Sequence, residues 1–134
     1  MRVGLDTSVL LRLLLGVPAE QAAAGLAFVK EARLAGKSVV ASDLVVTEAY
    51  FALHHHYGVP KREAVAQLLV LLRTGLIAPS DGPQVLASLE AASASSAKPG
   101  FVDRLIRAQY DRLAAGMVTF EHAGGRLPGT TVLS

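Results

Sequence analysis

Four acidic residues stand where a carboxylate could do chemistry as well as carry surface charge. The first, Asp6, follows residues 3–5, an apolar run long enough for a short buried strand. In open α/β sheets, ligands bind outside the carboxyl ends of the strands, so a carboxylate at this point is a candidate for a site. Asp and Thr are also favoured N-cap residues, and Asp6 or Thr7 could instead cap the following helix. From this stretch alone, the two interpretations have equal weight.

Glu48, Asp103 and Glu121 are the other candidate acids. Glu48 interrupts residues 44–53, a nearly uncharged segment that should form a largely buried helix, where a lone carboxylate is costly unless something compensates it. Asp103 falls in the first turn of a predicted helix, and the helix dipole alone could account for it. Glu121 directly follows a predicted strand and could be a solvated loop residue. Glu48 therefore has the weakest purely structural explanation.

Together, the four carboxylates predict a metal site. Carboxylates crowded into one pocket repel one another and take up protons unless a cation holds them. Hard divalent ions take oxygen ligands, and magnesium usually keeps several waters and needs only a few carboxylates. Such an ion can activate water and neutralise charge on a phosphodiester. Metal-assisted hydrolysis of a phosphodiester is therefore the chemistry that these residue types suit.

Composition limits the classes of protein to consider. A chain of 134 residues, 51% hydrophobic and 18% charged, is expected to fold as one domain with its own core. Because it has no cysteine, disulfides and thiolate metal sites are excluded. No apolar run is long enough to span a membrane and no signal peptide pattern is present, so we expect a cytoplasmic protein without a membrane partner. The net charge of +2 argues against binding nucleic acid by bulk charge.

Strand-like and helix-like segments alternate along the chain. We expect strands at residues 3–5, 37–41, 76–78, 117–119 and 131–133, and helices at residues 9–15, 20–35, 43–57, 60–73, 81–92 and 101–114. Residues 93–100 have the composition of a loop, and Ser42 or Asp43 caps the third helix. This alternation predicts a single α/β domain over residues 1–134, with a parallel sheet covered on both faces by helices.

Four segments, in this order, resemble the PIN-domain ribonucleases and especially the VapC-type toxins of toxin–antitoxin pairs. They are Val-Gly-Leu-Asp-Thr-Ser at 3–8, Asp-Leu-Val-Val-Thr-Glu at 43–48, Gly-Phe-Val-Asp-Arg-Leu-Ile at 100–106 and Val-Thr-Phe-Glu at 118–121. No single motif is decisive, but four in register over nearly the whole chain are specific. The resemblance implies a three-layer α/β/α PIN-like domain with a central parallel sheet of four to five strands.

The resemblance also implies roles for individual residues. Asp6, Glu48 and Asp103 take the places of the three core acids that bind magnesium or manganese, and Glu121 takes the place of the fourth. Thr7 and Thr119 match hydroxyl positions around that site.

Two positions depart from the family pattern. The fourth acid is usually Asp, so the role of Glu121 in a second metal site is open. Arg107 stands where the family often has a small residue. It could contact RNA phosphate or pair with Asp103, or it could form a surface pair with Asp111, four residues further along the same helix.

The activity that the resemblance implies is metal-dependent hydrolysis of RNA by the toxin of a type II toxin–antitoxin pair. A small antitoxin would bind over the site, and the toxin would form a homodimer. Residues 20–35 and 61–73 carry more apolar side chains than one helix face needs, and the surplus suits either a dimer interface or an antitoxin interface. An alternative from another class is a catalytically inactive PIN-like module that binds RNA or protein. An aspartate-nucleophile phosphatase would need Asp where Ser8 stands.

His54, His55 and His56 look like a metal site but have the wrong spacing. Successive residues of a helix point about 100° apart, and a metal-binding pair needs a separation of three or four. We interpret the three histidines as residues at the C-terminal end of a helix, where they interact favourably with the helix dipole.

Overall fold

The computed structural model describes residues 1–95 and 98–134 and divides them into two compact units, Met1–Pro83 and Gln84–Ser134. Residues 96 and 97 of the predicted loop lie outside the described residues, and the residues before them extend the preceding helix as far as Ala94. A single domain over residues 1–134 stays a prediction. The two units are described separately below.

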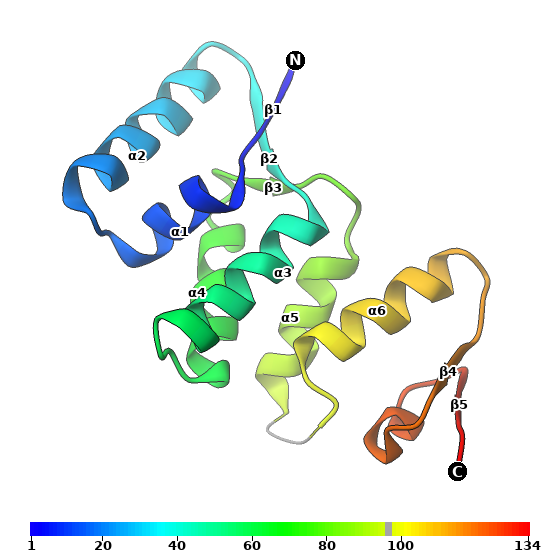
Figure 1. Cartoon of the computed structure of the whole chain (residues 1–134). Helices are drawn as coiled ribbons and strands as arrows, with labels where there is room; N and C mark the ends of the chain where they lie inside the picture. The colour runs from blue at the N-terminus through cyan, green and yellow to red at the C-terminus, as the bar shows by residue number, and fades with distance from the viewer. Residues whose placement is uncertain (96–97) are drawn as a thin grey trace. The chain divides into compact units, whose positions relative to one another are not determined.

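The first unit contains a three-stranded parallel sheet, drawn side by side in Figure 1. Its strands, in the order in which they pair, are β1 (Arg2–Gly4), β2 (Ser38–Ala41) and β3 (Ala78–Pro79). Val3 pairs with Val39, and Val40 pairs with Ala78. The central strand β2 is buried along most of its length, which is why its sequence is an unbroken apolar run.

Helices make up most of the rest of the first unit. They are α1 (Thr7–Leu15), α2 (Ala19–Leu34), α3 (Asp43–Phe51), the π-helix η1 (Ala52–His56) and α4 (Lys61–Arg73). Helix α1 packs against α2, α3 and α4, while α2 packs against β2. Fully buried side chains, among them Leu10, Val46, Leu53 and Leu68, form the core between these elements.

The ends of these helices are fixed by local contacts that the sequence indicates. Ser42 is the N-cap of α3, because its hydroxyl accepts a hydrogen bond from Val45 N at 3.2 Å. Asp43 is the first residue of the helix, and its backbone N–H donates to Asp81 Oδ2 at 2.7 Å. Gly16 ends α1 in the left-handed conformation, with φ of 72°, where its N–H donates to Arg12 O.

The second unit is built from a helix pair and a strand pair. Its elements are α5 (Gln84–Ala94), α6 (Phe101–Arg112), β4 (Met117–Thr119), the 3₁₀ helix η2 (His122–Arg126) and β5 (Thr130–Val132). Helices α5 and α6 pack together around Leu89 and Phe101, both fully buried. Strands β4 and β5 are parallel, with Val118 opposite Thr131.

The prediction of one parallel sheet with four to five strands is wrong in the number of strands that the sheet contains. The parallel pairing is present, but it forms one sheet of three strands and a separate sheet of two. Val118 in β4 is 64% exposed and the next apolar residue, Phe120, is 72% exposed, so β4 is not a buried central strand. An apolar run predicts that a strand exists, but its partner depends on contacts far along the chain.

Among the residues that the structure describes, no single helix is long and apolar enough to cross a membrane. Helices α1 and α2 meet that requirement only when taken together, across a bend of 111° between them.

Candidate functional site

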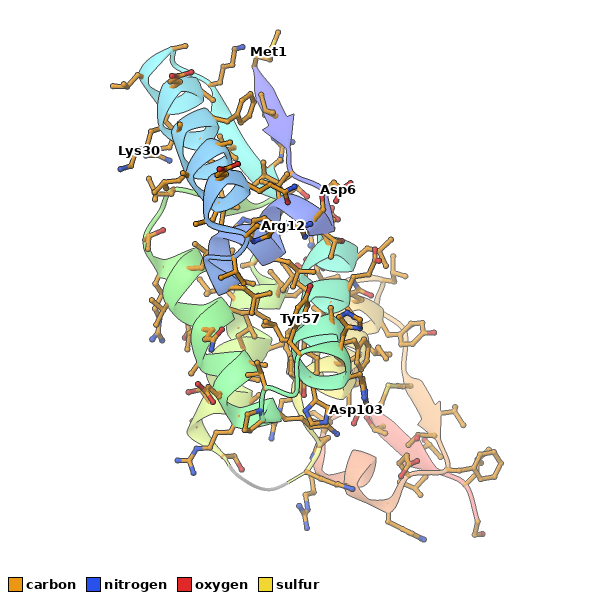
Figure 2. The ribbon with its side chains drawn as sticks, turned by 60° about the vertical axis from the view of Figure 1, so that its left-hand side comes forward. Met1, Asp6, Arg12, Lys30, Tyr57 and Asp103 are labelled. Carbon is orange, nitrogen blue, oxygen red and sulfur yellow. The ribbon has the colours of Figure 1, made fainter. Side chains whose placement is uncertain are left out.

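Asp6 lies at the junction of β1 and α1, as expected, and is labelled there in Figure 2. Leu5 extends the strand pairing by one hydrogen bond, from its N–H to Val40 O at 2.9 Å. The chain then turns into α1, and Asp6 Oδ1 accepts a hydrogen bond from Ser8 N at 2.6 Å. The capping role is therefore confirmed. Because Asp6 is exposed and one oxygen is enough for the cap, its second carboxylate oxygen is available to a ligand.

Thr7 is the first residue of α1, directly after this cap, and is partly exposed. Its position next to Asp6 follows from the chain alone. A role for its hydroxyl at a metal site stays a prediction.

Glu48 is exposed on α3, so the expectation that it is a buried charge is wrong. The helix buries Val46, Ala49 and Tyr50 and leaves Leu44, Glu48 and Phe51 exposed. The segment is apolar around most of its circumference, so its sequence does not reveal which side faces the core. Exposure removes the desolvation cost of the carboxylate, and it leaves both oxygens of Glu48 open to a ligand from solvent.

Asp103 and Glu121 belong to the second unit, and both are exposed. Asp103 is in the first turn of α6, where the N-cap residue Gly100 supplies no side-chain cap. Glu121 closes a short turn after β4, in which its backbone N–H donates to Thr119 Oγ1 at 3.0 Å. Thr119 therefore fixes the backbone that carries Glu121, a use of its hydroxyl that the sequence did not indicate.

Gly124 packs closely against the Thr119 side chain of the same turn. A Cβ at Gly124 would lie 2.9 Å from the Thr119 methyl, so the backbone of η2 passes directly over that side chain. Only a residue without a side chain permits this approach.

Arg107 is held by groups of its own unit. Its Nε donates to Pro128 O, its Nη1 donates to Ala115 O at 3.4 Å, and its Nη2 lies 3.5 Å from an Asp111 carboxylate oxygen. The side chain is only 11% exposed. The predicted pair with Asp111 is confirmed, and this bonding favours a structural role for Arg107 over a contact with RNA phosphate, which stays a prediction.

The four acids divide equally between the two units: Asp6 and Glu48 in one, Asp103 and Glu121 in the other. Within either unit, residues 1–95 and 98–134 contain no group of three or more His, Asp or Glu side chains able to hold a metal ion. The donors nevertheless fit a hard divalent cation by their chemistry, because all four are exposed carboxylates. Each stays a predicted ligand.

The histidines follow α3 in the π-helix η1, in which the chain closes a wider turn through the bond from Tyr57 N to Ala52 O at 3.1 Å. His54 bonds through Nδ1 to Val59 O at 2.9 Å. The His55 ring stacks on Phe51, with ring centroids 5.9 Å apart and an interplanar angle of 23°. The histidines lie at the end of a helical segment, as expected, but the stacked pair was not predicted. The spacing of four between Phe51 and His55 is the only sequence signal for it.

The expected apolar surface of the first unit lies partly on α2. Phe28, at a regularly spaced apolar position, is 48% exposed, while the helix packs inward through Val29 and Ala32. A cavity of about 270 Å³ lies against the same helix and is lined by residues of α1, α2, α4 and the segment before β3, including Leu13, Leu26, Leu71 and Ile77. The first unit therefore has both exposed apolar side chains and an apolar hollow beside them.

Comparison with known proteins gives one match. The family model described as PIN domain matches residues 3–126 and so covers all four acids. Neither a curated protein nor a solved structure matches the chain.

Proposed function

We propose that this chain, which belongs to the PIN domain family, is a metal-dependent endoribonuclease. PIN domains are generally nucleases and typically use divalent metal ions. The observation that carries the proposal for this chain is that Asp6, Glu48, Asp103 and Glu121 are all exposed carboxylates within the matched range. Such side chains offer the oxygen ligands that magnesium and manganese take.

In this mechanism Asp6, Glu48 and Asp103 would hold the ion, with Glu121 assisting. When bound, the ion would supply an activated water and stabilise charge on the phosphodiester. The chain's contribution is to fix the ligands beforehand. The Ser8 N–H holds one oxygen of Asp6, and the Thr119 hydroxyl holds the backbone at Glu121. Ligands fixed in this way lose less conformational freedom when a substrate binds.

The sharpest test is the variant Asp6→Asn. Asn also caps helices well, and its side-chain oxygen can still accept from Ser8 N, so the fold should persist with a free energy of unfolding close to that of the parent. Cleavage of RNA should fall to the background level, because the amide is a weak ligand for a hard ion. The readout is cleavage of labelled single-stranded RNA with magnesium or manganese, and its loss with chelator.

Matched controls separate the site from surface charge in general. Asp111→Asn removes an exposed carboxylate from the same helix as Asp103, and Glu63→Gln removes one from α4, in the same unit as Glu48. Both controls should cut RNA like the parent, whereas Asp103→Asn and Glu48→Gln should not. Undiminished cleavage by Asp6→Asn with added magnesium would remove Asp6 from the site.

The finer proposal is a VapC-type toxin, cytoplasmic and homodimeric, that a small antitoxin inhibits. Its support is the apolar surface of α2 and the cavity beside it, since exposed apolar surface of this kind suits a protein partner. Sedimentation of the isolated chain at micromolar concentration should give a dimer. A monomer would leave the antitoxin as the partner for this surface.

An inactive PIN-like module that binds RNA or protein is the second candidate. The observation in its favour is Glu121, where the family pattern has Asp. Binding of magnesium does not separate the two candidates, since an inactive relative could retain it. Cleavage of RNA that chelator abolishes separates them.

A further inference from the structure

Exposed rings are concentrated in one short segment of the first unit. Residues 50–57 contain three of the chain's seven Phe and Tyr residues and three of its four His residues. Phe51, His55, His56 and Tyr57 are all exposed, and Phe51 keeps 42% of its surface in contact with solvent. Rings of this size usually gain from burial, so an exposed group of them indicates a surface that binds something.

Two of these rings are nearly parallel and stacked on each other. Phe51 and His55 lie 5.9 Å apart at an interplanar angle of 23°, whereas the ring pairs His54–His55 and His56–Tyr57 are edge-on, at 68° and 84°. Neighbouring bonds hold the segment in place: the π-helical turn closes from Tyr57 N to Ala52 O, and His54 is tied to Val59 O. Figure 2 labels Tyr57, the residue that ends the π-helix. The stacked pair is therefore held by a fixed backbone.

This surface continues the helix face that carries a predicted metal ligand. Glu48 and Phe51 are three residues apart on α3, and His55 follows four residues later, so the three exposed side chains succeed one another along one face. The charged residues between Glu48 and Glu63 are both basic. Residues 49–62 contain no Asp or Glu, and they end in Lys61 and Arg62, both exposed at the start of α4. The Cα atom of Lys61 lies within about 15 Å of that of Tyr57, since consecutive Cα atoms are about 3.8 Å apart.

We propose that Phe51 and His55 form a stacking platform for an unpaired base of an RNA substrate, with Lys61 and Arg62 beside its phosphates. Single-stranded RNA is bound through aromatic rings that stack on splayed bases, together with basic side chains that follow the backbone. A protein partner fits this surface less well, because the exposed residues from 55 to 62 include two imidazoles and two cations but no Val, Leu or Ile. The platform rests on the proposed function, as the subsite that delivers a single strand to Glu48.

Binding measured without metal tests the platform separately from cleavage. Fluorescence anisotropy of a labelled, unstructured single-stranded RNA is recorded in chelator for the parent, Phe51→Ala, His55→Ala and Phe51→Trp. Tyr110→Ala is the matched control, since Tyr110 is an aromatic residue exposed to a similar degree, at 45%, and belongs to no site or interface proposed above. Phe51→Ala should raise Kd about tenfold, within the range measured for loss of one stacked base, and Phe51→Trp should restore binding. Tyr110→Ala should bind like the parent.

The outcomes distinguish the platform from the nuclease. Equal affinities for Phe51→Ala and Tyr110→Ala, or no binding by the parent, overturn the platform. A shift of Phe51→Ala from dimer to monomer in sedimentation, with RNA affinity unchanged, also overturns it and identifies the surface as a contact between copies of the chain. Binding that depends on Phe51 without any metal-dependent cleavage supports the platform and refutes the nuclease. If the parent cuts RNA, Phe51→Ala should raise KM more than it lowers kcat.

Discussion

Arg107→Ala is expected to loosen the C-terminal strand pair of the second unit without disturbing helices α5 and α6. The guanidinium reaches from α6 to the carbonyls of Pro128 and Ala115, which lie on the segments leading into β5 and β4. Truncation to Ala removes both donors at once. The strand pair then keeps its own backbone hydrogen bonds, such as the one from Leu133 N to Thr119 O at 2.7 Å, and the bond from Arg126 Nη1 to Lys98 O.

The expected loss of stability can be worked from these contacts. A hydrogen bond from a charged group contributes about 1.5–3 kcal/mol, and only the Nε bond to Pro128 is short enough to count in full. The exposed pair with Asp111 adds at most about 1 kcal/mol, because that carboxylate is 77% exposed. The local free energy of opening should therefore fall by about 2 kcal/mol in Arg107→Ala, while Asp111→Ala should lower it by less than about 1 kcal/mol.

Amide hydrogen exchange measures this loss where it occurs. A change of about 2 kcal/mol corresponds to exchange roughly 30-fold faster across residues 117–133. Peptides from α5 and α6 should keep the parent's rates. Arg107→Lys should behave almost like Arg107→Ala, because an ammonium group lacks the planar fork that reaches several acceptors. Equal exchange in Arg107→Ala and Asp111→Ala would refute the reasoning.

A double-mutant cycle with Gly129 provides a second check. Gly129 has a φ of 69°, and a Cβ there would overlap the Arg107 guanidinium. Gly129→Ala alone therefore combines backbone strain of about 1–2 kcal/mol with displacement of the guanidinium. In the Arg107→Ala background only the backbone strain should remain, so the two substitutions should cost less together than the sum of their separate effects. Additive effects would contradict this close approach.

Three further predictions remain, and two of them concern the turn that carries Glu121. Glu121→Ala should raise the magnesium or manganese concentration needed for RNA cleavage and lower the rate, while Glu121→Asp keeps substantial activity; superimposable metal titrations for both variants and the parent would remove Glu121 from the site. Gly124→Ala should cost about 1–3 kcal/mol, since its Cβ would lie 2.9 Å from the Thr119 methyl. Gly25→Ala in α2, whose Cβ would meet side chains at 3.5 Å or more, should stabilise the chain by about 0.5–1 kcal/mol. Chemical denaturation should show a lower free energy of unfolding for Gly124→Ala and a higher one for Gly25→Ala.

Local structure could be predicted from the sequence where the signals were local. Pro60 and the spacing of apolar residues placed a helix at 60–73, and α4 is Lys61–Arg73. Strand β4 has the predicted bounds, Met117–Thr119. The partner of that strand could not be predicted, because an apolar run of three residues carries no information on which edge it joins.

The same limit applies to the candidate site. The position of Asp6 between strand and helix followed from its neighbours, and the structure added its capping bond. The exposure of Glu48 did not follow, because its segment is apolar on nearly every side and the buried face is chosen by the helices that pack against it. The π-helix after Phe51 also has no local signature, since residues 52–57 suit a continued α-helix.

The arginines of the second unit are engaged in hydrogen bonds within that unit. Each of the four arginines in residues 98–134 donates to a carbonyl oxygen of its own unit. The pairs are Arg104 with Pro99, Arg107 with Pro128, Arg112 with the Gln84 side chain and Arg126 with Lys98. Because these bonds occupy guanidinium donors within the unit, we expect this half of the chain to contribute few phosphate contacts. The salt dependence of RNA binding should then come mainly from basic residues of the first unit, such as Lys61 and Arg62.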